Sequence, residues 1–182
     1  MVETDIRRTE EGELVLSHDP ITNADGLVRL SELLTAVEGF PLNLEVKNFP
    51  GEGGFEPDHD SGLATAELAR PGDLLTCFFW PTVDEIHRRF PEVATGLLVD
   101  RSWDLTIATR HARSVGHKTL VAHWSVALDQ AQATKAAAEQ GLEIVVWTLN
   151  DVTRITELAN LGVTAIITDD PGAMSAALKD QR

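Results

Sequence analysis

The sequence has few of the features that mark secreted, membrane-spanning or nucleic-acid-binding proteins. Its 182 residues include one cysteine, Cys77, so an internal disulfide is excluded. No apolar run approaches the roughly 20 residues that a bilayer-spanning helix needs. The opening residues Met1–Asp5 lack the basic and apolar regions of a signal peptide. We therefore expect no membrane span, and the cytoplasm is the default location.

Basic residues are also scarce. Fifteen Lys and Arg face 29 Asp and Glu, which leaves a formal net charge of -14. Such a chain repels a polyanionic backbone and lacks the basic stripe that nucleic-acid binding requires, so we expect no nucleic-acid partner. A bound divalent cation can still make the electrostatic potential positive at one site, so that an acidic protein binds a phosphate there. The net charge therefore leaves a small phosphodiester substrate open.

The hydrophobic content, 43%, is enough for one sizeable core, and we expect a single domain over residues 1–182. Short apolar runs alternate with helix-like segments seven times. Strands are expected near 2–8, 42–48, 74–79, 94–99, 119–124, 143–149 and 164–168. Helices are expected near 31–38, 61–70, 82–89, 104–116, 126–140, 151–161 and 171–179. Such alternation predicts an α/β fold with parallel strands. Because no Gly-rich phosphate loop follows a strand, a TIM-type (β/α) barrel is favoured, incomplete, with about seven of its eight βα units.

Acidic residues recur at a spacing of two on the expected strands. Glu3 and Asp5 point to the same side of the first strand, and Glu45 and Lys47 repeat this arrangement on the second. Three converging carboxylates, without cysteine or closely paired histidines, suit Mg²⁺ or Ca²⁺ better than zinc. Each acid taken alone is also typical of a solvated strand end, but all lie on strands that otherwise resemble buried ones.

His18 follows the extended run Glu13–Ser17 and precedes Asp19. Imidazole exchanges protons near neutral pH, which suits a general acid. A lone histidine in a turn is also typical of a surface or capping residue.

These residues together resemble the glycerophosphodiester phosphodiesterase family. Glu3–Asp19 looks like its signature of Glu-x-Asp, a Thr-x-Asp-Gly-like turn and His-Asp. Asn43–Lys47 is similar to the Glu-x-Lys strand of the family. Val146–Asn150 and Gly162–Pro171 are similar to its later motifs. The resemblance thus extends over nearly the whole chain.

The resemblance implies a TIM barrel with a metal-dependent site at the C-terminal ends of its strands, where glycerophosphodiesters are split into an alcohol and glycerol 3-phosphate. By this resemblance a divalent cation is held by Glu3, Asp5 and Glu45. Lys47 would face the phosphate, and His18 would be one of a pair of catalytic histidines.

Trp147 matches the aromatic residue of a Trp-Thr-x-Asn strand end in the family and would pack against the glycerol part of the substrate. A single Trp at a barrel rim is equally typical of plain packing. The loop Phe49–Asp60 is long for a barrel connection and is interpreted either as a lid or as a solvated flexible loop.

The sequence departs from the family at one point. The family pattern opens with a strand ending in His-Arg-Gly, followed by Pro-Glu-Asn, and neither is present. A mis-assigned start or fragment, an inactive remnant, and a shortened form that closes as a homodimer are the competing explanations. His123, at an expected strand end, is a candidate substitute but is more typical of a packed or rim histidine. Two alternatives to the hydrolase therefore stay open. One is an inactive remnant that binds a cation or a phosphorylated ligand, and the other is a related phospholipase D-type phosphodiesterase.

Overall fold

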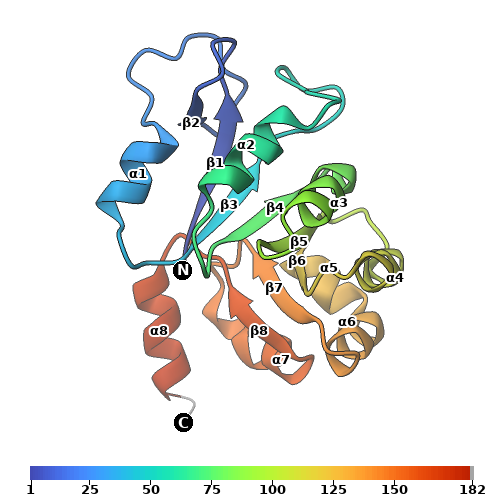
Figure 1. The fold of residues 1–182 in the computed structure, drawn as a ribbon. Helices are drawn as coiled ribbons and strands as arrows, with labels where there is room; N and C mark the ends of the chain where they lie inside the picture. Colours follow the sequence, from blue (N-terminus) through green and yellow to red (C-terminus); the bar gives the residue numbers. More distant parts are fainter. Residues whose placement is uncertain (181–182) are drawn as a thin grey trace. The chain divides into compact units, whose positions relative to one another are not determined.

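The computed structural model describes residues 1–180. It divides the chain into two compact units, Met1–Gly96 and Leu97–Arg182. Strands and helices alternate along both units, as the colours of Figure 1 show.

The first unit is built on three parallel strands that lie side by side, in the order β1, β3 and β4. A short strand, β2, pairs antiparallel with the other side of β1. Strand β5 crosses the boundary between the units. The strands are β1 (Val2–Arg8), β2 (Leu14–Leu16), β3 (Leu42–Val46), β4 (Leu74–Cys77) and β5 (Ala94–Val99). The helices are α1 (Leu30–Ala36), α2 (Asp60–Leu68) and α3 (Trp80–Arg89).

The core of this unit is formed by apolar side chains of its strands. Leu42, Leu44 and Val46 are all buried, and Ile6 on β1 is fully buried beside them. Helices α2 and α3 pack closely because α2 has a glycine at their contact. A Cβ added to Gly62 would lie 2.6 Å from a side-chain carbon of Thr82.

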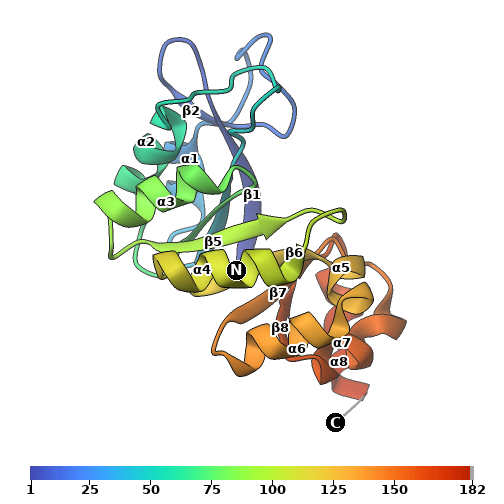
Figure 2. The ribbon, with the colours of Figure 1, turned by 90° about the vertical axis from the view of Figure 1, so that its right-hand side faces the viewer.

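The second unit contains three further parallel strands, in the order β6, β7 and β8. In Figure 2, helices α5, α6 and α7 lie against β7 and β8. Its buried cluster is formed by Ala127, Val146, Leu149, Ile155, Leu158 and Met174. The strands are β6 (Thr119–His123), β7 (Glu143–Trp147) and β8 (Val163–Ile166). The helical elements are α4 (Leu105–Val115), α5 (Trp124–Asp129), α6 (Ala131–Glu139), η1 (Val152–Arg154), α7 (Ile155–Asn160) and α8 (Pro171–Asp180).

All seven expected strands are present within a few residues of their predicted bounds. Two details differ. Strand β2 was not counted because it has three residues, too few to show a period. The helix expected over 126–140 is divided at Gln130, whose side chain accepts a hydrogen bond from the N–H of Leu105 and donates one to the carbonyl of Trp103. The division thus serves a tertiary contact.

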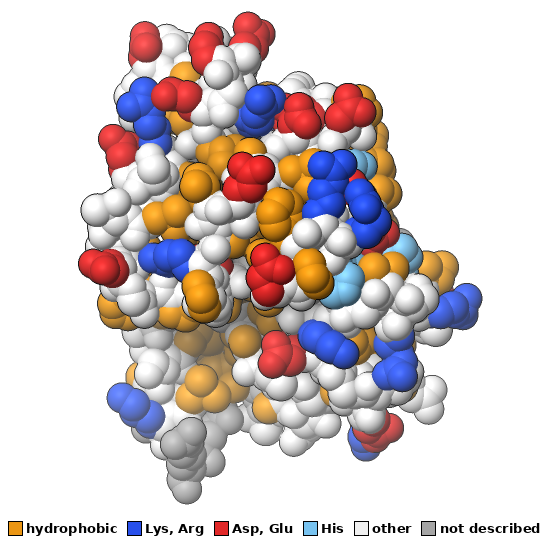
Figure 3. Space-filling view, viewed as in Figure 1, with side chains coloured by type: hydrophobic (Ala, Val, Ile, Leu, Met, Phe, Trp, Pro, Cys, Tyr) orange, Lys and Arg blue, Asp and Glu red, His pale blue; other side chains and the backbone are white. Residues whose placement is uncertain are grey.

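Within the described residues, no helix combines the length and the apolar character needed to cross a membrane. Acidic and basic side chains are interspersed on the face shown in Figure 3.

Candidate active site

The site forms where β1 and β3 run parallel. Their register sets Asp5 opposite Glu45, and alternation along β1 keeps Glu3 on the same side as Asp5. One carboxylate oxygen from each of Glu3, Asp5 and Glu45 can therefore lie within 4.8 Å of the other two. The structure thus brings together the three acids that the sequence singled out.

Burial and mutual repulsion act on these acids. Burial first, and then the charges of Asp5 and Glu45, raise the pKa of Glu3 from 4.5 to about 7. Burial also raises the pKa of Glu45, although the neighbouring Lys47 opposes this shift. The cluster therefore carries more negative charge than its surroundings stabilise, and a bound cation would relieve this imbalance.

Lys47 lies among the carboxylates. Its Nζ is 2.9 Å from Glu45 Oε1 and 3.6 Å from Asp5 Oδ1, and its side chain is 11% exposed. Burial by itself would lower the pKa of Lys47, but the charges of Glu45 and Asp5 outweigh it and raise the pKa. The amine is therefore protonated at neutral pH and can supply a positive charge to an anionic ligand.

His18 reaches this region through the β1–β2 hairpin. The N–H of Ser17 donates to the carbonyl of Asp5 at 3.1 Å, which brings the chain back beside the cluster. The His18 ring is 74% exposed, and its Nδ1 lies 2.9 Å from Asp19 Oδ1. Its charge is among those that act to lower the pKa values of Glu3 and Glu45, so the ring lies within electrostatic range of both acids.

The loop that follows β3 is tied down by Asn48, which is 1% exposed. The Asn48 side chain accepts from the N–H of Glu56 at 2.8 Å and donates to the Glu56 carbonyl at 2.9 Å. It also donates to Thr82 Oγ1 at 3.0 Å. The loop is thus anchored to both β3 and α3, so it is held in a defined path.

Sequence reasoning passed over Arg7. Its side chain lies on the same side of β1 as Glu3 and Asp5, is almost fully buried, and donates to the carbonyl of His18 and to Glu52 Oε2. The sequence did contain a signal for Arg7. Residues 3, 5 and 7 point to the same side of β1, and a basic residue follows two acidic ones at this spacing.

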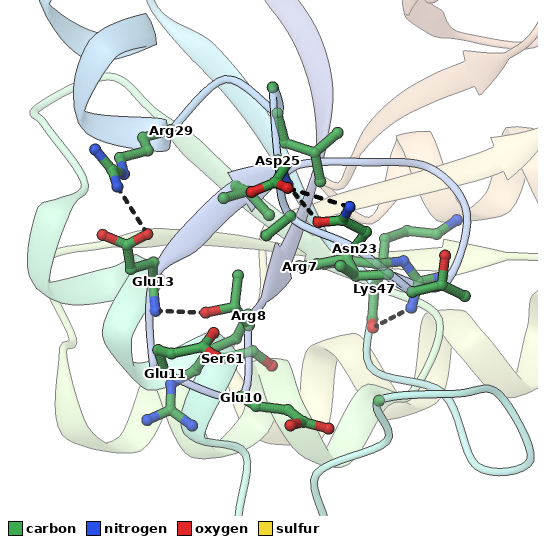
Figure 4. Close-up of a pocket in the computed structure, with 18 of the residues that line it drawn as sticks. Arg7, Arg8, Glu10, Glu11, Glu13, Asn23, Asp25, Arg29, Lys47 and Ser61 are labelled. Atoms are coloured by element: carbon green, nitrogen blue, oxygen red, sulfur yellow. Dashed lines mark hydrogen bonds and ion pairs between the residues drawn. The ribbon is translucent and has the colours of Figure 1, made fainter.

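A polar pocket of about 770 Å³ opens beside Lys47 and Arg7 (Figure 4). Its walls come from the β1–β2 hairpin, the segment 21–29 and the glycines of the loop after β3. The salt bridge between Arg29 and Glu13 (3.0 Å) closes one side. The pocket has room for a small polar ligand on the side of the hairpin where Lys47 and Arg7 lie.

Trp147 and His123 belong to the second unit, at the ends of β7 and β6. Their rings meet edge to face, with centroids 5.1 Å apart. Trp147 Nε1 donates to the carbonyl of Val121 at 3.0 Å, so packing fixes its orientation. His123 Nδ1 accepts from the N–H of Ser125, and burial, followed by the charge of Arg101, lowers the pKa of His123. His123 therefore caps α5 as a neutral ring.

Solved structures with the same fold cover nearly the whole chain. A glycerophosphodiester phosphodiesterase from Parabacteroides distasonis is 19% identical, with a TM-score of 0.82 over 98% of this chain and 83% of the other. An Oleispira antarctica phosphodiesterase, solved with the product sn-glycerol-3-phosphate, is 20% identical, with a TM-score of 0.74 over 97% and 84%. A glycerophosphodiester phosphodiesterase from Thermotoga maritima is 20% identical, with a TM-score of 0.67 over 99% and 84%. These likenesses show the fold: a TIM-type (β/α) barrel, incomplete, with about seven βα units.

No curated protein matches the chain. The model of the glycerophosphoryl diester phosphodiesterase family matches residues 59–173. This range includes Trp147, whereas Glu3, Asp5, His18, Glu45 and Lys47 lie before it. The match extends over more than half of the sequence, and the chain belongs to the glycerophosphoryl diester phosphodiesterase family, a family of phosphoric diester hydrolases.

Proposed function

We propose that the protein hydrolyses glycerophosphodiesters to an alcohol and sn-glycerol 3-phosphate, with a divalent cation held by Glu3, Asp5 and Glu45. The observation that carries this proposal is the cluster of three carboxylates around a protonated lysine, in a chain of this family.

The residues fit a hard cation. All three donors are carboxylate oxygens, which Mg²⁺ and Ca²⁺ prefer, and burial together with mutual repulsion makes full ionisation of the cluster unfavourable without added positive charge. A bound Mg²⁺ or Ca²⁺ would polarise the phosphoryl oxygens. The choice between these two ions is left to the experiment.

The side chains divide the remaining work. The Lys47 ammonium pairs with a non-bridging phosphate oxygen and stabilises the charge that develops there. His18, whose ring is exposed, gives a proton to the oxygen of the departing alcohol as the bond between that oxygen and phosphorus breaks. A water oxygen forms the new bond to phosphorus and releases its proton to solvent.

The test is release of sn-glycerol 3-phosphate from glycerophosphocholine, with Mg²⁺, with Ca²⁺ and with EDTA. We expect cation-dependent turnover that Glu45→Gln lowers by about 100-fold or more, because the substitution removes one ligand charge without changing side-chain size. Glu157→Gln is the matched control, since Glu157 pairs with Arg154 at the surface of the second unit. Cation binding without turnover would favour a non-catalytic binding role. A cyclic phosphate formed from lysophospholipid or sphingomyelin would favour the phospholipase D-type reaction.

A further inference from the structure

Arg7 is the most heavily engaged charged side chain beside the candidate site, and the proposed reaction gives it no role. It is 4% exposed. Its Nε and Nη2 donate to the carbonyl of His18 at 3.2 and 2.9 Å. Its Nη1 donates to the carbonyls of Gly53 (3.2 Å) and Lys47 (3.4 Å), and Nη2 also donates to Glu52 Oε2 at 2.9 Å. One guanidinium thus joins three separate segments of the chain.

Most of these hydrogen bonds from Arg7 are accepted by main-chain carbonyls. A buried cation costs several kcal/mol unless acceptors and an opposite charge compensate it. Among the residues that the structure describes, its one ion-pair partner is Glu52, whose side chain is 41% exposed, and its other acceptors are carbonyl oxygens. The guanidinium therefore fixes the path of the backbone at His18, Lys47 and Gly53, and Glu52 balances its charge.

His18 needs such support because few contacts hold its ring in place. The side chain is 74% exposed and hydrogen bonds to Asp19, its neighbour in sequence. Its position relative to the carboxylates therefore depends on the backbone that carries it. Arg7 holds that backbone from β1, two residues beyond Asp5, and it holds the carbonyl of Lys47 at the same time.

We propose that Arg7 is a positioning residue that fixes the main chain of His18 relative to Lys47 and the loop after β3. Its catalytic consequence rests on the proposed function, whereas the positioning itself does not. Arginine suits the task because its planar fork directs donors to several acceptors at once, whereas a lysine ammonium acts as a single point.

Hydrogen exchange tests the positioning without catalysis. In Arg7→Lys we expect amide exchange in residues 17–19 and 47–54 to accelerate by about tenfold or more, because the charge remains and the fork is lost. Arg8→Lys is the matched control, since Arg8 is the next residue on β1 and pairs with Glu56 and Asp60 instead. If Arg7→Lys does not fold, Arg7→Gln is measured in its place, with the same expectation. Exchange equal to that of the unsubstituted chain in both segments would overturn the proposal.

A double-mutant cycle tests the consequence for turnover. We expect Arg7→Lys to lower kcat for glycerophosphocholine by about tenfold with KM changed less than about threefold, as for a misplaced proton donor. In the His18→Ala background, Arg7→Lys should lower kcat by less than about twofold, because the side chain that Arg7 positions is already absent. If Arg7→Lys still lowers kcat by about tenfold in the His18→Ala background, Arg7 does not act through His18. Absence of turnover in the unsubstituted chain would refute the proposed function, while the exchange experiment would still decide on Arg7.

Discussion

Binding of a divalent cation should release a proton from Glu3. In the metal-free chain, burial and the charges of Asp5 and Glu45 raise the pKa of Glu3 to about 7. A cation held by the same carboxylates favours their ionised form. The prediction is that metal binding and loss of the Glu3 proton are coupled, so that affinity rises with pH up to about 8.

The magnitude follows from the titration curve. With a pKa of about 7, Glu3 carries about 0.8 proton at pH 6.5 and about 0.03 at pH 8.5. Adding saturating Mg²⁺ or Ca²⁺ at pH 6.5 should therefore release about 0.8 proton per chain from this residue, and almost none at pH 8.5.

Calorimetric titrations in two buffers of different ionisation enthalpy measure this release, with Glu3→Gln as the comparison. The variant should bind the cation more weakly and release fewer protons at pH 6.5. Equal release by the chain and by Glu3→Gln would show that another group supplies the proton, and the reasoning about Glu3 would then be wrong.

The same shift predicts how stability depends on pH. Since the folded chain holds the Glu3 proton more tightly than the unfolded chain, stability is greatest below the ordinary pKa of 4.5 and is lost as pH rises through about 7. One pKa unit corresponds to about 1.4 kcal/mol, and solvent screening at this partly exposed group reduces the expected loss to about 1–2 kcal/mol. Urea unfolding of the metal-free chain should show this slope, and Glu3→Gln should flatten it. An unchanged slope in the variant would contradict the assignment.

Three further outcomes are expected. Asn48→Ala should lower the free energy of unfolding by about 2–3 kcal/mol in urea titrations, because it leaves the N–H and the carbonyl of Glu56 without their partner and removes one of the hydrogen bonds of the Thr82 hydroxyl; a loss below 0.5 kcal/mol would contradict the anchoring role. Asp104→Ala should cost about 1 kcal/mol, because its side chain accepts from the first N–H groups of α4; Asp104→Asn, which retains an acceptor, should cost less. Cys77 should resist a thiol reagent in the folded chain and react after unfolding, because it is fully buried and burial raises its pKa to about 12; rapid reaction without denaturant would show that β4 is accessible.

The sequence was sufficient to predict the carboxylate cluster because that cluster depends on local periodicity. Glu3 and Asp5 share a face of one strand whatever surrounds them, and parallel pairing of successive strands is expected of a chain that alternates strands and helices. One further fact, the register that sets Asp5 opposite Glu45, completes the cluster.

The role of Arg7 could not be predicted in this way. Apart from Glu52, its acceptors are main-chain carbonyls that lie 11, 40 and 46 residues away along the chain, and a carbonyl has no signature in a sequence. The division of the expected helix at Gln130 was missed for a related reason, since the side chain bonds to Trp103 and Leu105 of another segment.

By itself, the sequence determined which residue types alternate on each strand, where helices and strands follow one another, and which acids could share a face. These properties depend on neighbours within a few residues. Tertiary structure alone decided the raised pKa of Glu3, the protonated state of Lys47 among the acids, and the attachment of His18 to Arg7. Each of these depends on burial and on distances between segments remote in sequence, and only the folded chain sets them.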